Sequence, residues 1–175
     1  IDVDISTGTL SEKWIKTIVD NSEHTTGSVF DFDCDGKAQV VYRDENNLYV
    51  WDGETGTVQA SIQCGSATRS ELPTIVDVDA DGQVNIVCAC ATTNGGAAGT
   101  VKAFNSSTNQ WVGSRKVMNQ HSYDVVNIND DLSIPIHQQD NALLPKLNGF
   151  LAQSPIYDVN WNSTCILLAN VNVSI

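Results

Sequence analysis

Two short acidic segments, 46 residues apart, share one pattern of side chains. Residues 31–36 read DFDCDG and residues 77–82 read DVDADG, so each places a carboxylate at every second position and ends on a glycine. Alternate acids in a tight loop can turn their oxygens toward one point, and Ca²⁺ takes about six to eight oxygen ligands. Glycine adopts the positive φ that such a turn requires. The pattern therefore predicts two Ca²⁺-binding loops.

The predicted ligands are found by numbering each loop from its first aspartate. The seventh position of such a loop donates a backbone carbonyl, and the ninth can offer a side-chain oxygen. The predicted metal ligands are Asp31, Asp33, Asp35, Lys37 and Gln39 in the first loop, and Asp77, Asp79, Asp81, Gln83 and Asn85 in the second.

The residues around each loop exclude an EF-hand. An EF-hand carries a bidentate Glu at its twelfth position, where this chain has Tyr42 and Cys88. Apolar, β-type residues flank both loops, as at 28–30 and 39–42 around the first. We therefore expect the loops to connect neighbouring β-strands. The competing interpretation is a pair of plain acidic turns, because Asp and Gly are ordinary turn residues.

The loops belong to a longer internal repeat of roughly 40–50 residues. Residues 48–56 after the first loop align with residues 101–109 after the second, and the Gly/Ala/Thr-rich stretch 91–99 absorbs the difference in spacing. Each unit is predicted to contain about four short strands joined by turns, which is typical of a propeller blade or a related β-array. Only residues 10–19 have spacing that could suit a helix, and their Thr and Val content leaves that open.

A third segment, NINDDL at residues 127–132, resembles the two acidic loops less closely. It keeps oxygen-bearing side chains at alternate positions, but Leu132 stands where the other loops have glycine. A bulky side chain resists the positive φ of such a turn. We expect a structural hairpin or a degenerate blade here.

Residues 14–134 resemble FG-GAP repeats of the VCBS type. The resemblance rests on the first loop with the following VVYRDENNLYVWDGETG, and on ELPTIVDVDADGQVNIV around the second. These calcium-bearing blades occur in integrin-like propellers and in large secreted bacterial surface proteins. The resemblance implies Ca²⁺ on the six loop aspartates, an all-β fold and a secreted or cell-surface location. The chain departs from the family at the ninth loop position, where an acid is common and Gln39 or Asn85 stands, which implies weaker binding.

The predicted organisation is a repeat domain over residues 1–134 and a proline-punctuated connector with terminal β-strands over 135–175. The blades fall around 20–70 and 71–114, with a degenerate blade at 115–134. Residues 1–5 and 171–175 alternate apolar and polar side chains, so each reads as a half-buried strand that needs a neighbour. Two blades are too few to close a propeller. Three arrangements would each cover the edges: the two terminal strands pair within one chain, the chain belongs to a longer propeller of a larger surface protein, or a terminal strand is donated to the next copy, giving a filament.

The charge and hydropathy of the chain bear on its partners. A net charge of −12 and a pI near 4.3 argue against nucleic-acid binding, which needs a basic surface. No apolar run approaches the length of about 18 residues that a membrane span requires. The chain begins at Ile1 without a leader sequence, which we interpret as a processed product or a fragment and not as evidence against secretion.

The five cysteines leave at least one unpaired, and a disulfide among the others would suit an oxidising compartment. Cys88 and Cys90 lie two apart on a predicted strand and project to one face, where Cys64 could reach one of them. Cys34 is expected to be an inert small side chain that points away from the metal. Cys165 is a candidate for a buried thiol or an intermolecular bond. N-glycosylation patterns occur at Asn105, Asn162 and Asn172.

No catalytic motif is present in the sequence, and we expect neither an active site nor an organic cofactor. The sequence thus predicts a calcium-stabilised, extracellular, structural or adhesive β-repeat protein. The alternative is a non-catalytic carbohydrate-binding or targeting module of a large secreted enzyme. Exposed tryptophans would favour that alternative through contacts with glycans, although core packing is the more common role of this residue. The four tryptophans are Trp14, Trp51, Trp111 and Trp161.

Overall fold

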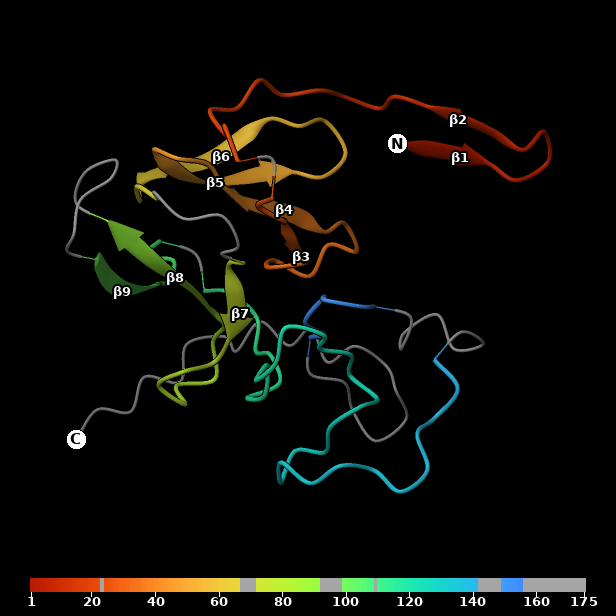
Figure 1. The fold of residues 1–175 in the computed structure, drawn as a ribbon, viewed down its shortest axis with the longest axis vertical. Helices are drawn as coiled ribbons and strands as arrows, with labels where there is room; N and C mark the ends of the chain where they lie inside the picture. The colour runs from red at the N-terminus through yellow and green to blue at the C-terminus, as the bar shows by residue number, and fades with distance from the viewer. Residues whose placement is uncertain (23, 67–71, 92–98, 109, 142–148, 156–175) are drawn as a thin grey trace.

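The computed structural model describes residues 1–22, 24–66, 72–91, 99–108, 110–141 and 149–155. In these residues nine β-strands form three antiparallel sheets and no helix occurs (Figure 1). None of the three sheets closes on itself. The predicted all-β fold is therefore confirmed.

The first large sheet is a four-stranded meander in which consecutive strands lie side by side. The turn after β4 is fixed by Asp44, whose Oδ1 accepts hydrogen bonds from the backbone N–H groups of Asn46 and Asn47. Alternation along β4 buries Val41 on one face and leaves Tyr42 half-buried on the other. The strands are β3 (Ser28–Phe30), β4 (Gln39–Arg43), β5 (Asn47–Asp52) and β6 (Val58–Gln63).

The second large sheet repeats this order with three strands. These are β7 (Thr74–Val76), β8 (Asn85–Ala91) and β9 (Gly99–Phe104). The acidic loops connect β3 to β4 and β7 to β8, as the internal repeat predicted. Among the described residues no strand pairs with the outer edge of β9.

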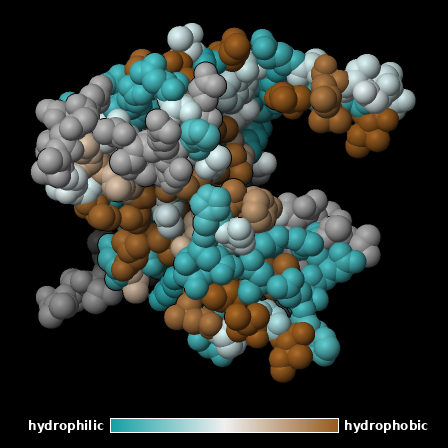
Figure 2. Space-filling view, in the orientation of Figure 1, coloured by the Kyte–Doolittle hydropathy of each residue, from teal (hydrophilic) through white to brown (hydrophobic). Residues whose placement is uncertain are grey.

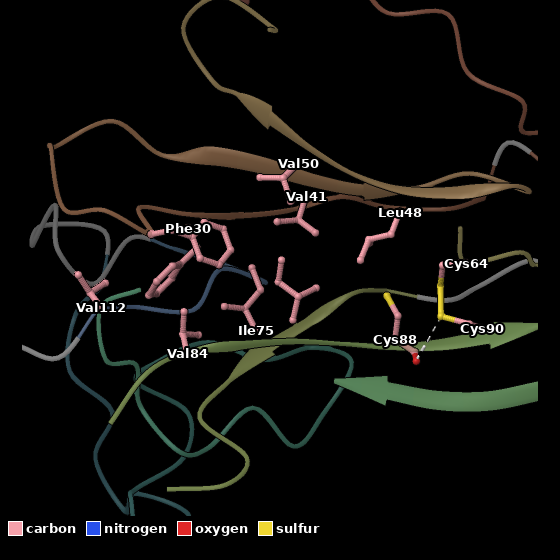
Figure 3. Close-up of a cluster of buried hydrophobic side chains, with 12 residues drawn as sticks. Phe30, Val41, Leu48, Val50, Cys64, Ile75, Val84, Cys88, Cys90 and Val112 are labelled. Atoms are coloured by element: carbon pink, nitrogen blue, oxygen red, sulfur yellow. Dashed lines mark hydrogen bonds between the residues drawn. A yellow bond between two sulfur atoms is a disulfide. The ribbon is translucent and has the colours of Figure 1, made fainter. Parts of the chain in front are cut away.

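A shared hydrophobic core lies between the two large sheets (Figure 3). Phe30, Val41 and Leu48 from the first sheet pack against Ile75 and Ile86 from the second, and each of these side chains is at most 2% exposed. Full burial of one such side chain contributes about 1.5–3 kcal/mol. The core therefore fixes how the two acidic loops lie relative to each other.

The N-terminal residues form a separate hairpin, which lies away from both large sheets in Figure 1. It consists of β1 (Asp2–Asp4) and β2 (Thr9–Ser11). Its strands are exposed on both faces, and apolar side chains reach the surface there (Figure 2). A strand is present within residues 1–5, at Asp2–Asp4, but it is exposed on both faces, so the predicted half-burial was wrong. β2 and the irregular chain after it replace the helix considered for residues 10–19.

The chain after the second sheet contains no β-strand within residues 110–141 and 149–155. A small core of Val117, Tyr123 and Ile128 organises this region. A turn is present at residues 129–133, where the Asn129 N–H donates to the Ser133 carbonyl at 2.9 Å, but no strands flank it, so the expected hairpin is not formed. Leu132 nevertheless adopts a φ of +68°, which our steric argument disfavoured; its side chain is 61% exposed.

Candidate metal centre

Each acidic loop brings three carboxylates together. One oxygen from each of Asp31, Asp33 and Asp35 lies within 4.8 Å of the others, and the same holds for Asp77, Asp79 and Asp81. The first aspartate is half-buried in the first loop and buried in the second, while the third- and fifth-position aspartates are exposed. These are the two groups of this kind in the described part of the chain.

The two loops have the same backbone conformation. The fourth position takes a positive φ in both, at +62° for Cys34 and +59° for Ala80, and the glycine at the sixth position follows at +87° or +88°. The glycine N–H donates to Oδ2 of the first aspartate, at 2.9 Å for Gly36 and 3.3 Å for Gly82. Each loop is thus closed by one oxygen of its first carboxylate.

The other oxygen of that carboxylate is left unsatisfied. Oδ1 of Asp31 and Oδ1 of Asp77 are buried and accept no hydrogen bond from the described residues, and Asp77 is only 5% exposed. A buried polar oxygen without a partner costs about 1–3 kcal/mol, and more when it is charged. Burial raises the pKa of Asp31, although the Gly36 N–H opposes the shift. A cation held between the three carboxylates would supply the missing partner.

The seventh and ninth positions stabilise the loops from within. The backbone N–H of Lys37 donates to Asp35 at 2.8 Å, and that of Gln83 donates to Asp81 at 2.7 Å. At the ninth position, Oε1 of Gln39 accepts the Phe32 N–H at 2.9 Å.

Asn85 repeats this contact in the second loop, where its Oδ1 accepts the Val78 N–H at 3.0 Å. Both amide side chains therefore tie the start of a strand to the second loop residue. Sequence reasoning missed this role; the signal was the same replacement of an acid by an amide in both copies. Metal binding by these two side chains stays a prediction.

Two disulfides involve cysteines of the described region. Cys64 is bonded to Cys90, which confirms that Cys64 reaches one of the two cysteines on β8. Cys34, at the fourth position of the first loop, is also disulfide-bonded, so our expectation of an inert side chain was wrong. Cys88 is a free, buried thiol. Cys165 lies outside the described residues.

The two loops are joined through one residue that sequence reasoning did not identify. Val112 donates its N–H to the Phe32 carbonyl and accepts the Val84 N–H at its own carbonyl, both at 3.0 Å. Phe32 belongs to the first loop and Val84 to the second. Val112 comes from the chain after β9, and its side chain belongs to the shared core (Figure 3).

The aromatic side chains considered for glycan contacts pack mostly against one another. Trp51 is 6% exposed and stacks with Tyr42 and Tyr49, at ring-centroid distances of 5.8 and 5.2 Å. Trp14 meets Trp51 edge-on and donates its indole N–H to the Gly53 carbonyl. These contacts fit a packing role. Trp161 lies outside the described residues.

No protein-family model matches the chain, and no curated protein is significantly similar to it. The fold is similar to that of the biofilm matrix protein Bap1 of V. cholerae, with a TM-score of 0.63 and 23% sequence identity. The similarity covers 74% of this chain and 22% of Bap1, so the chain spans about a fifth of that protein. At this level of identity the likeness establishes the β fold. In the part of the chain that the structure describes, no helix has the length and hydropathy to cross a membrane.

Proposed function

We propose that this chain is a non-catalytic, calcium-stabilised β-repeat segment of a secreted or cell-surface protein with a structural or adhesive role. The observation that carries the proposal is the pair of equivalent loops, each with three converging carboxylates and one buried, unsatisfied aspartate oxygen. The likeness to a biofilm matrix protein supports the extracellular setting. The proposal includes FG-GAP-type blades, of which the two large sheets would be two.

The chemistry of the donors favours Ca²⁺ over other divalent ions. All candidate ligands are oxygen atoms, whereas Zn²⁺ prefers nitrogen and sulfur. Mg²⁺ requires near-ideal octahedral geometry and releases its water reluctantly, while Ca²⁺ accepts irregular oxygen shells. Bound Ca²⁺ would neutralise the clustered carboxylates and hold each loop in its turn. Asp31 and Asp77 would then serve both purposes, one oxygen closing the backbone and the other binding the ion.

Thermal unfolding tests the calcium part of the proposal. A Ca²⁺ concentration 100-fold above the dissociation constant stabilises a folded protein by about 2.7 kcal/mol per site. The melting temperature should therefore rise with Ca²⁺ and fall with chelator, and Mg²⁺ should have a smaller effect. The double variant Asp33→Ala/Asp79→Ala should lose the response. Glu54→Gln, which removes an exposed acid paired with Lys37 outside the clusters, should keep it. An identical melting temperature in Ca²⁺ and chelator would contradict the proposal.

The exposed N-terminal hairpin supports an assembly role. Val3 and Leu10 are directly paired across its strands and are 63% and 68% exposed, so they form an apolar face in contact with solvent. Such a face is suited to a second copy, through strand exchange, or to the rest of a larger surface protein. Light scattering should show larger species for the wild-type chain than for Val3→Ser/Leu10→Ser. Monomers of equal size in both cases would rule out self-association through the hairpin.

A further inference from the structure

We infer that the two acidic loops bind Ca²⁺ cooperatively and that the Val112 peptide unit couples them. The inference rests on the proposed calcium sites and concerns their regulation. Val112 is 4% exposed and lies in the core shared by the two large sheets.

Val112 is hydrogen-bonded to both loops through its backbone. Its N–H is bonded to the carbonyl of Phe32, which lies between Asp31 and Asp33. Its carbonyl is bonded to the N–H of Val84, which lies directly before Asn85. One residue thus joins the second position of the first loop to the eighth position of the second. Neither contact depends on the identity of the Val112 side chain.

The contacts on the first loop leave little freedom for independent movement. The Phe32 N–H is held by Gln39 and its carbonyl by Val112, and the ring is 3% exposed. That ring packs between Phe30 and Trp111, with centroid distances of 5.0 and 4.5 Å. A change in the first loop therefore has to move residues 111–112.

The second loop is held in the same way. Val84 is fully buried, and its neighbour Asn85 holds the Val78 N–H. Displacement of Val112 therefore reaches both ends of this loop. Without a cation the three carboxylates of a loop repel one another, which favours its opening. An ion in one loop would order Val112, so that less conformational entropy is lost when the second ion binds.

The expected sign of the coupling distinguishes it from simple charge effects. Two cations repel each other, so electrostatics alone would make the second ion bind more weakly. By contrast, if the first ion orders Val112 and so the other loop, the second ion binds more tightly. A Hill coefficient above 1 for Ca²⁺ is therefore the signature of the link.

Calcium titration by isothermal calorimetry tests the inference on the intact chain. Asp79→Ala/Asp81→Ala leaves only the first loop, and Asp33→Ala/Asp35→Ala leaves only the second. We expect the wild-type chain to bind two ions cooperatively, and each single-loop variant to bind one ion at least about 5-fold more weakly than the wild-type mean. A wild-type isotherm equal to the sum of the two variants would overturn the coupling and leave the calcium sites intact. No uptake by any of the three proteins would overturn the proposed function itself.

Substitution of Val112 tests the coupling residue. Val112→Pro removes the N–H that binds Phe32, and Val112→Ala keeps both backbone bonds. We expect the proline variant to bind two ions with a Hill coefficient near 1 and the alanine variant to stay cooperative. Equal cooperativity in the two variants would overturn the role of Val112. Should the proline variant not fold, the fluorescence of Trp111 provides the second measurement. Ca²⁺ binding to the second loop in Asp33→Ala/Asp35→Ala should change this emission, isolated by subtracting Trp111→Phe, and unchanged emission would contradict the link.

Discussion

Cys64 and Cys90 join the two large sheets by a disulfide, with their Cα atoms 4.6 Å apart. Cys64 follows the last strand of the first sheet, and Cys90 lies in β8 of the second (Figure 3). Directly beside the disulfide, Gly65 and Ala91 form an isolated antiparallel bridge. The covalent bond and this bridge therefore fix one end of the interface between the sheets.

Removal of this disulfide should destabilise the chain substantially. The bond closes a loop with a sequence separation of 26 residues. The chain-entropy model gives about 3.5 kcal/mol for a loop of this size. Chemical denaturation of Cys64→Ala/Cys90→Ala should show a loss of this order, whereas Cys88→Ala, which removes the free thiol, should lose less. An equal loss in both variants would show that packing and not the cross-link provides the stability.

The buried thiol of Cys88 should make stability fall at high pH. Burial raises its pKa to about 11 from an ordinary value of 9.0, and the nearby Arg43 charge opposes the shift. The folded state therefore keeps the proton longer than the unfolded state does. The resulting stability is complete below pH 9 and is lost as the pH rises toward 11, by up to about 1.4 kcal/mol per pH unit. Urea unfolding at pH 8.5, 9.5 and 10.5 should show a steeper decline for the wild type than for Cys88→Ala. Parallel curves would contradict this assignment.

The parts of the site that were predictable are local in sequence. Three alternate aspartates and a glycine specify both the carboxylate cluster and the turn within six residues, so the clusters that contain Asp31 and Asp77 were found without knowledge of the fold. The alternation of apolar residues specified the strands on either side for the same reason. The outcome for Leu132 shows the limit of this reasoning, because the backbone bonds of its turn overrode a local steric preference.

The parts of the site that were not predictable are contacts between residues that lie far apart in the sequence. Val112 meets Phe32 only because the chain passes between the loops after β9, and nothing in the residues around it indicates that path. Arg43 is similar, since its buried guanidinium donates to the Ala89 carbonyl of the opposite sheet and to Ser66. Every residue has a backbone carbonyl, so the sequence does not show which carbonyl accepts a given hydrogen bond. Contacts of this kind emerge only from the packed structure.

Arg115 should be essential to the region after the sheets. Its guanidinium donates to the Val125 and Ile128 carbonyls, to the Tyr123 hydroxyl and to Asp130. Arg115→Ala would leave several part-buried acceptors without this donor, and we expect a loss of about 3 kcal/mol. Arg115→Lys should restore little, because an ammonium cannot reproduce the planar fork of donors.

Asp130→Ala provides the matched control for Arg115. The Asp130 side chain is 81% exposed, and a surface ion pair contributes about 0–1 kcal/mol. Both effects should be the same in Ca²⁺ and in chelator, because the carboxylate clusters lie in the two acidic loops. Chemical denaturation of both variants in Ca²⁺ and in chelator measures these losses of stability. A calcium-dependent loss in Arg115→Ala would show that this region is coupled to the proposed calcium sites.

Leu132 should be a position where a single substitution stabilises the chain. The left-handed backbone conformation costs a residue with a Cβ roughly 1–2 kcal/mol, and Leu132 adopts it with a φ of +68°. Glycine relieves this strain but gives up more conformational entropy on folding, so we expect a net gain of about 0.5–1 kcal/mol for Leu132→Gly. Leu132→Ala is the control, because it removes the exposed side chain and retains the strain. The melting temperature should rise for the glycine variant and stay nearly unchanged for alanine. A similar rise in both would indicate that exposure of the leucine, and not its backbone conformation, limits stability at this turn.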